Sequence, residues 1–161
     1  MRAAKVQRRF TFSSTQGRFA ILDEGAEPLE ADAWTPESLG RRLAPGRGSL
    51  GVGTVDRFTQ VAVTVVVRDH EPPLDGIERW AFVVEGSIEL PSGRLRVAPG
   101  AGGGRSAGHL DLAPGPYRAR IACDRGGELA VVPGGTETYH VDLWPAPALS
   151  PRVLHSAHGS R

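Results

Sequence analysis

The sequence predicts an all-β fold, either an antiparallel β-sandwich or a partly open barrel, of about eight strands with one short helix. Three observations carry this prediction. The 21 glycines and 13 prolines fall between apolar segments, as they do where turns join many short strands. Several of those segments alternate apolar and polar side chains, and only one segment begins with the signals of a helix.

The most apolar segment is Phe58 to Arg68, whose valines predict a central strand buried on both faces. Arg79 to Leu90, Tyr117 to Cys123 and Thr138 to Trp144 alternate, which is typical of strands with one face toward a core. Asp124 to Gly135 is expected to be a glycine-rich loop. Further strands are expected at residues 6–12, 18–23, 50–55, 94–97 and 109–112.

The single helix is expected at Pro36 to Leu43. Thr35 is a good N-cap residue, proline suits the first helical position, and Glu37 adds negative charge to the first turn. A βαβ fold would need several helices of about ten residues or more between its strands, so the sequence argues against that class.

The chain is expected to form one domain over residues 1–147, followed by a disordered tail over residues 148–161. No apolar run approaches the roughly 18 residues that span a bilayer, and no apolar stretch follows the basic N-terminal residues as in a secretory signal. A single cysteine, Cys123, forms no internal disulfide. We therefore expect a cytoplasmic protein without membrane contact.

Charge argues against direct nucleic-acid binding. The chain has 19 basic and 18 acidic residues and a net charge of +1, whereas nucleic-acid-binding domains usually carry a strong basic excess. The expected partner is therefore another protein.

The motifs that could indicate catalysis do not lie in the structural context that catalysis needs. Gly46 to Gly51 matches G-x-G-x-x-G, but a helix precedes it and a strand follows, which reverses the order of a dinucleotide site. Cys123 shares an apolar strand face with Tyr117, Ala119 and Ile121, so we expect a buried thiol rather than a nucleophile. The sequence predicts no catalytic residue, no metal site and no cofactor.

Three histidines leave an alternative open. His70 lies between two acidic residues in a predicted loop, His109 begins a short strand, and His140 shares a strand face with Asp142. A carboxylate beside an imidazole can orient the ring, but a structural zinc normally takes four ligands. A solvent-facing polar row is the favoured interpretation, and a His-containing pocket is the alternative.

The remaining candidates form a predicted recognition surface. Alternation places two pairs of arginines on outward strand faces, and side-by-side strands would join them into one patch suited to carboxylates or phosphates. Trp144 also falls on an outward face, and an exposed Trp near Arg is typical of a binding hot spot. The predicted surface comprises Arg94, Arg96, Arg118, Arg120, His140, Asp142 and Trp144.

Between Ala33 and Pro145 the sequence resembles a family of small bacterial proteins related to competence protein J. The stretches that carry the resemblance are Trp80 to Gly93 (WAFVVEGSIELPSG), Pro114 to Arg120 (PGPYRAR) and Tyr139 to Pro145 (YHVDLWP). The resemblance implies a non-catalytic protein, and the best-known relative inhibits a partner nuclease involved in DNA uptake.

Fold, weak charge, motifs out of context and this resemblance together predict a protein-binding module. We expect an inhibitor or immunity-type partner of a bacterial nuclease or toxin, encoded near its target. The alternative class is a small β-domain enzyme or ligand-binding protein with a His-containing pocket, and a third is a structural subunit of a larger assembly.

Overall fold

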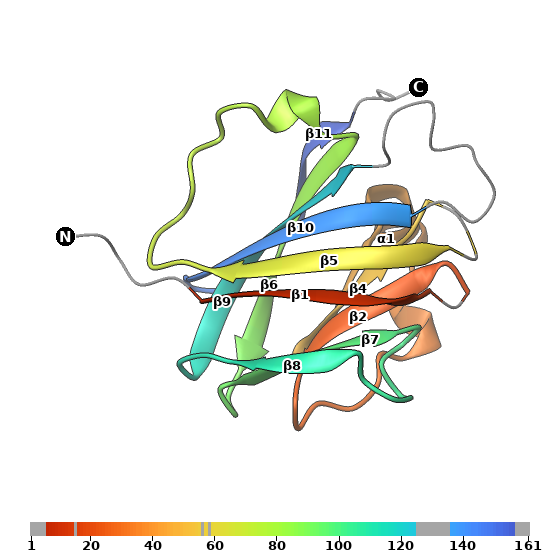
Figure 1. Ribbon diagram of the computed structural model, residues 1–161, viewed down its shortest axis with the longest axis vertical. Coiled ribbons are helices and arrows are strands. Elements are labelled where there is room, and N and C mark those ends of the chain that lie inside the picture. The colour runs from red at the N-terminus through yellow and green to blue at the C-terminus, as the bar shows by residue number, and fades with distance from the viewer. Residues whose placement is uncertain (1–5, 15, 56, 58, 125–135, 157–161) are drawn as a thin grey trace.

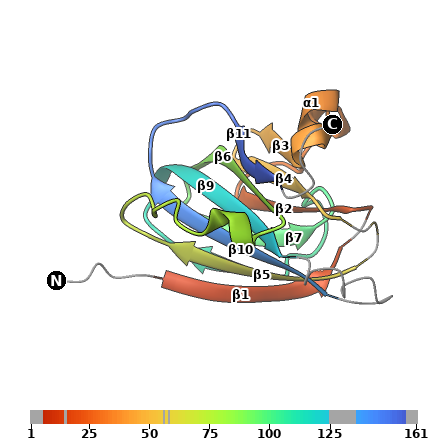
Figure 2. The ribbon, with the colours of Figure 1, turned by 90° about the horizontal axis from the view of Figure 1, so that it is seen from above.

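The structure, a computed structural model, describes residues 6–14, 16–55, 57, 59–124 and 136–156. Two β-sheets pack face to face around one core (Figures 1 and 2). The β-sandwich that the sequence predicts is confirmed, although the described residues form eleven strands rather than about eight. The loop predicted at 124–135 lies, apart from its first residue, outside the described residues.

The first sheet has six strands in the order β1, β5, β10, β9, β6, β11. All neighbours run antiparallel except β5 and β10, which are parallel. The parallel pair departs from the purely antiparallel expectation, and the long connection between these two strands makes it possible. The strands are β1 (Val6–Ser13), β5 (Gln60–Val67), β10 (Thr136–Pro145), β9 (Gly115–Asp124), β6 (Phe82–Leu90) and β11 (Arg152–Ser156).

The second sheet has five antiparallel strands in the order β3, β4, β2, β7, β8. The G-x-G-x-x-G stretch spans the turn between β3 and β4, so a strand directly precedes it rather than the expected helix, and a strand, not a helix, follows it. The strands are β3 (Leu43–Gly46), β4 (Ser49–Gly53), β2 (Arg18–Asp23), β7 (Arg94–Pro99) and β8 (Gly108–Asp111).

The core lies between the two sheets. Val61, Val63 and Val65 of β5 join it, and Val66 is buried as well, as expected for a strand covered on both faces. Cys123 is also buried, as its place on an apolar face predicted, and desolvation raises the pKa of its thiol to about 12. A thiol with so high a pKa is a poor nucleophile at neutral pH.

The helix α1 (Pro36–Arg41) begins where the sequence predicts, with the Thr35 hydroxyl oxygen accepting the amide hydrogen of Ser38 at 3.1 Å. It ends two residues early because Arg42 adopts the left-handed conformation (φ 61°) and Leu43 begins β3. Two short 3-10 helices, η1 (Ala31–Ala33) and η2 (Ile77–Arg79), were not predicted. None of the helices in the described residues is long and apolar enough to cross a membrane.

The C-terminal segment corrects the expected tail at 148–161. Residues 152–156 form β11, which lies beside β6 (Figure 1). The two strands pair antiparallel, with Arg152 opposite Glu85. The edge of β6 has backbone groups that no other described strand pairs with, and a short segment is sufficient to bind them. Residues 148–156 therefore belong to the folded domain, while residues 157–161 lie outside the described part of the chain.

Candidate functional site

The central strands of the six-stranded sheet turn charged side chains away from the core. In the strand register, Arg120 lies opposite both Asp142 on β10 and Glu85 on β6, and Trp144 lies opposite Arg118. Two segments, residues 68–81 and 145–151, contact this outer face. The outward side chains of β9 are therefore covered rather than solvated.

Glu85 is the centre of a buried ion cluster. Its carboxylate, 1% exposed, accepts hydrogen bonds from Arg118 Nε at 3.2 Å and from Arg120 Nε at 2.8 Å, one on each oxygen. Arg152 Nε of β11 adds a longer contact of 3.4 Å. The alternation along residues 79–90 puts Glu85 on the face of the strand away from the core, where a charged side chain was expected to meet water. Only its arginine partners make its burial tolerable, because an isolated carboxylate is costly to remove from water.

Arg118 and Arg120 fasten the covering segments to the sheet. Arg118 donates through Nη1 to the carbonyl of Leu149 and through Nη2 to that of Ser150, each at 3.0 Å. Arg120 Nη1 donates to the carbonyls of Pro72 (2.9 Å) and Pro73 (3.1 Å). Both arginines are less than 5% exposed, so the expectation that they face solvent is wrong. An alternating pattern predicts which side of a strand a residue faces, but it does not predict whether another segment covers that side.

Trp144 is likewise buried, at 5% exposure. The Arg120 guanidinium stacks over its ring, 5.2 Å from the centroid, in a cation–π contact. The expected exposed hot spot at Trp144 is therefore also wrong. The ring packs beneath the same arginine that holds residues 72–73.

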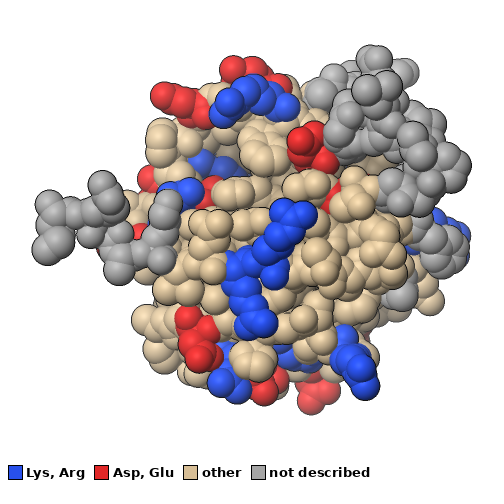
Figure 3. Space-filling view, in the orientation of Figure 1, with Lys and Arg blue, Asp and Glu red and all other residues tan. Residues whose placement is uncertain are grey.

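Arg94 and Arg96 lie on β7 in the other sheet, so the single arginine patch does not form. Arg94 Nε pairs with Asp111 at 3.0 Å, and Arg96 Nη1 donates to Ser106 at 3.1 Å. Each arginine thus has a partner within its own sheet or the adjoining loop. The face in Figure 3 carries a short stripe of basic side chains over β1, with acidic groups nearer its edges.

Three of the predicted residues do come together at an opening. Arg120, His140 and Asp142 line a pocket of about 240 Å³ between the outer sheet face and residues 72–80. The other charged and aromatic side chains of the lining are those of Arg68, Asp75, Arg79 and Trp80. We call this opening the His140 pocket.

Asp142 organises the His140 pocket. Its Oδ1 accepts a hydrogen bond from Arg68 Nε at 2.6 Å and lies 3.2 Å from His140 Nε2. Burial raises the pKa of the Asp142 carboxyl, but the hydrogen bonds from His140 and Arg68 outweigh it, and the net shift is downward. Asp142 is thus ionised at neutral pH. The Trp80 ring lies 6.0 Å from the His140 ring, centroid to centroid.

The other two histidines are exposed and do not line this pocket. His70 lies in the loop after β5 and His109 on β8, so the His-pocket alternative now depends on His140 alone. Among the described residues, no three His, Cys, Asp or Glu side chains gather closely enough to hold a metal ion.

Sequence reasoning missed Arg68, Trp80 and the burial of Glu85. Glu85 carried a usable signal, because it stands between Val84 and Gly86 in a largely apolar stretch, where a charge needs a partner. No comparable signal in the sequence marks Arg68 or Trp80 as part of a site. Their place depends on how residues 68–81 cross the sheet, which no local pattern encodes.

These features define a two-sheet β-sandwich with an ion cluster buried under segments that contact its outer face and a small pocket beside that cluster. The fold is similar to the crystal structure of ComJ, inhibitor of the DNA degrading activity of NucA, from Bacillus subtilis. The TM-score is 0.69 at 14% identity, covering 89% of this chain and 100% of that one. The similarity confirms the ComJ-like fold that the sequence resemblance implied.

A second similar structure is described as crocagin biosynthetic gene J. Its TM-score is 0.61 at 16% identity, covering 90% of this chain and 100% of that one. No protein-family model matches the sequence, and no curated protein matches it. At these identities the likeness concerns the fold alone.

Proposed function

We propose that this protein is a non-catalytic protein-binding module that inhibits a partner nuclease or toxin. The observation that carries the proposal is the match to ComJ over the whole of that chain, because ComJ inhibits the DNA degrading activity of NucA. The identity is low, so the likeness supports a protein partner in general more strongly than any particular one. We also propose that the partner is encoded nearby and that both act in the cytoplasm.

The His140 pocket is one proposed contact point for the partner. Its volume of about 240 Å³ falls below the roughly 300–1,000 Å³ of typical small-molecule sites, so it suits a single side chain of a partner. Trp80 and Arg68 line it, and Trp and Arg are enriched at interface hot spots. Of the predicted binding surface, His140 and Asp142 are retained in this proposal. Arg118, Arg120 and Trp144 act by holding the pocket's walls.

Affinity capture from the native host tests this proposal. The tagged protein is expected to retain one partner. His140→Ala is expected to weaken retention by about tenfold, which corresponds to about 1.4 kcal/mol, because truncating a residue that carries binding energy costs more than about 1 kcal/mol. His70→Ala removes an exposed histidine that does not line the pocket and serves as the matched control. Finding no protein partner at micromolar concentrations would overturn the proposal.

A small enzyme or ligand-binding protein is the second candidate. It is favoured by one observation, the pairing of His140 with an ionised Asp142 inside a pocket. Elemental analysis of the purified protein and a panel of hydrolase substrates address it directly. Bound metal or turnover that disappears in His140→Ala would replace the binding-module proposal.

A further inference from the structure

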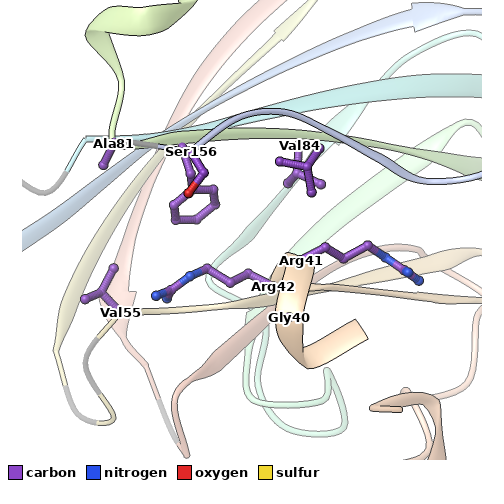
Figure 4. A pocket seen from close by; sticks show the side chains of 9 residues that line it. Gly40, Arg41, Arg42, Val55, Ala81, Val84 and Ser156 are labelled. Carbon is purple, nitrogen blue, oxygen red and sulfur yellow. The ribbon is translucent and has the colours of Figure 1, made fainter. Parts of the chain in front are cut away.

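Two further pockets flank α1 at one edge of the sandwich. The first, about 190 Å³, lies between α1 and strands β6 and β11 of the opposite sheet. Figure 4 shows α1 and Val55 on one side of this pocket and Ala81, Val84 and Ser156 on the other. The second, about 350 Å³, is lined by α1 together with the Gln16–Arg18 and Gly53–Thr54 segments. Because Gly40 and Arg42 line both pockets, we call the pair the α1 groove.

The charged lining of the α1 groove is entirely basic. Arg41 and Arg42 line the first pocket and Arg18 and Arg42 the second, and no carboxylate lines either among the described residues. Arg42 Nη1 donates to the Thr54 carbonyl at 3.2 Å and Arg41 Nε to the Leu43 carbonyl at 3.1 Å. In Figure 4 the Arg42 side chain extends toward Val55, whereas Arg41 points the other way.

These arginines differ from the others already described, apart from Arg96, whose partner is the Ser106 hydroxyl rather than a carboxylate. Arg68, Arg94, Arg118, Arg120 and Arg152 each pair with a carboxylate. Within the described part of the chain, the three arginines of the α1 groove form no such pair. A partner that supplies a carboxylate would therefore give these arginines the ion pair that they lack.

Aromatic rings hold two of the three guanidinium groups in place. Arg18 lies over the Trp34 ring at 4.7 Å and Arg42 over the Phe82 ring at 5.2 Å. A guanidinium stacked on a ring keeps its edge N–H groups available and loses less entropy when it binds a carboxylate. The groove is thus partly preorganised for an anion.

Exposed apolar side chains complete the groove. Leu39 on α1 is 56% exposed and Val153 on β11 is 51% exposed, so both add apolar surface beside the arginines. Together with the half-buried Trp34 they combine apolar area with arginine, the composition of an interface hot spot.

We propose that the α1 groove binds a segment of a partner protein in which carboxylates alternate with apolar side chains. The proposal rests on the proposed function, because it names the chemistry of the partner surface. A carboxylate would accept hydrogen bonds from Arg42, and a neighbouring apolar side chain would pack against Val153 or Leu39. The apolar lining and the net charge of +1 favour a protein over a nucleic acid, whose backbone needs a row of cations.

A direct binding experiment uses two matched hexapeptides, ELDFEL and QLNFQL, and a hexamer of deoxythymidylate. Amide chemical shifts of the full-length protein are followed by NMR during titration with each probe. ELDFEL is expected to shift the amides of Gly40, Arg42, Val55 and Val153, and to bind about tenfold more tightly than QLNFQL because its carboxylates form charge-assisted bonds. Raising the salt concentration is expected to weaken binding.

Two variants and one control locate the site. Arg42→Asn removes the guanidinium but suits the left-handed backbone at this position, and it is expected to weaken ELDFEL binding by about tenfold. Leu39→Ala changes an exposed side chain, cannot disturb the core, and is expected to weaken binding by about threefold. Arg9→Gln makes the same charge change on β1, the edge strand opposite β11, and is expected to leave affinity within about twofold.

Each outcome decides the proposal. Equal binding of the two peptides, shifts elsewhere on the surface, or tighter binding of the oligonucleotide would overturn it. If a protein partner is captured but ELDFEL does not bind the groove, the proposed function stands and this inference fails. If ELDFEL binds the groove but no partner is captured, the groove stands and the inhibitor proposal fails.

Discussion

Glu85 illustrates how single residues hold this molecule together. Its two carboxylate oxygens are shared between Arg118 and Arg120, and those arginines in turn bind backbone carbonyls of two covering segments. The cluster links three parts of the chain that are far apart in sequence. Its net effect is to fix where the segments lie, since a buried ion pair roughly offsets its own desolvation.

Glu85→Ala is expected to destabilise the protein by roughly 3–5 kcal/mol, because it leaves the buried Arg118 guanidinium without a carboxylate and Arg120 with only the exposed Glu71. Urea denaturation measures the loss. Glu89→Ala removes an exposed carboxylate from the same strand and is expected to change stability by less than about 0.5 kcal/mol. Equal effects of the two substitutions would mean that the cluster is not buried as described.

Cys123 gives the protein a pH dependence on the alkaline side. The ordinary pKa of 9.0 applies to the unfolded chain, whereas the folded thiol has a pKa of about 12. Between these values the unfolded chain binds fewer protons than the folded one, so the free energy of unfolding falls as pH rises. The stabilising contribution of the protonated thiol is therefore fully present only below pH 9. Tyr139, whose pKa burial also raises, acts in the same direction.

Cys123→Ala is expected to reduce the decrease in the free energy of unfolding between about pH 9 and about pH 11. The packing lost with the sulfur atom is expected to lower stability at neutral pH as well. Urea denaturation of both proteins over a series from about pH 8 to about pH 11 measures the two slopes. Identical slopes would show that the thiol ionises equally easily in the folded and unfolded chains.

At the scale of elements, alternation predicted the core faces of β9 and β10 but misjudged their outer faces. Tyr117, Ala119 and Ile121 lie in the core, as their spacing predicted. The opposite face was expected to meet water because its side chains are charged. It is covered because those charges pair with one another and with carbonyls of crossing segments, and pairing across distant segments leaves no periodic signal.

Gly86 of β6 marks a close approach of the two sheets. A Cβ atom there would lie 2.8 Å from a methyl carbon of Leu43 and 3.1 Å from one of Leu50, both fully buried. Gly86→Ala is therefore expected to cost about 1–3 kcal/mol in thermal or urea denaturation through overpacking.

Gly40→Ala is the matched control for Gly86→Ala. A Cβ atom at this helical position meets nothing within 4 Å, so the substitution is expected to leave stability unchanged or raise it by up to about 1 kcal/mol. If Gly86→Ala is tolerated as well as Gly40→Ala, β3 and β4 do not pack on β6 as closely as described.

At the scale of the whole molecule, the domain extends further than composition suggested. Residues 148–156 follow Pro147, contain Pro151 and were expected to be a disordered tail. However, β11 covers the edge of β6, and two carbonyls just before it accept hydrogen bonds from Arg118. Only the edge of a sheet formed elsewhere in the chain gives this segment its structure. A single-sequence pattern therefore could not identify it.

Truncation after Pro147 tests this domain boundary. The shortened chain loses β11 and both carbonyl partners of Arg118, so its stability is expected to fall by at least about 2 kcal/mol, since hydrogen bonds to charged groups contribute about 1.5–3 kcal/mol each. Urea denaturation of chains ending at 147 and at 156 measures the difference. Equal stability of the two chains would restore the boundary that the sequence predicted.

Calorimetry with purified components tests the central claim, that the protein acts by binding another protein, most directly. The protein captured from the native host is titrated into this one, and its own activity is assayed in parallel. We expect a complex with a Kd of about 1 μM or tighter and loss of the partner's activity on binding. A titration without heat or complex formation at about 100 μM, with the activity unchanged, would contradict it.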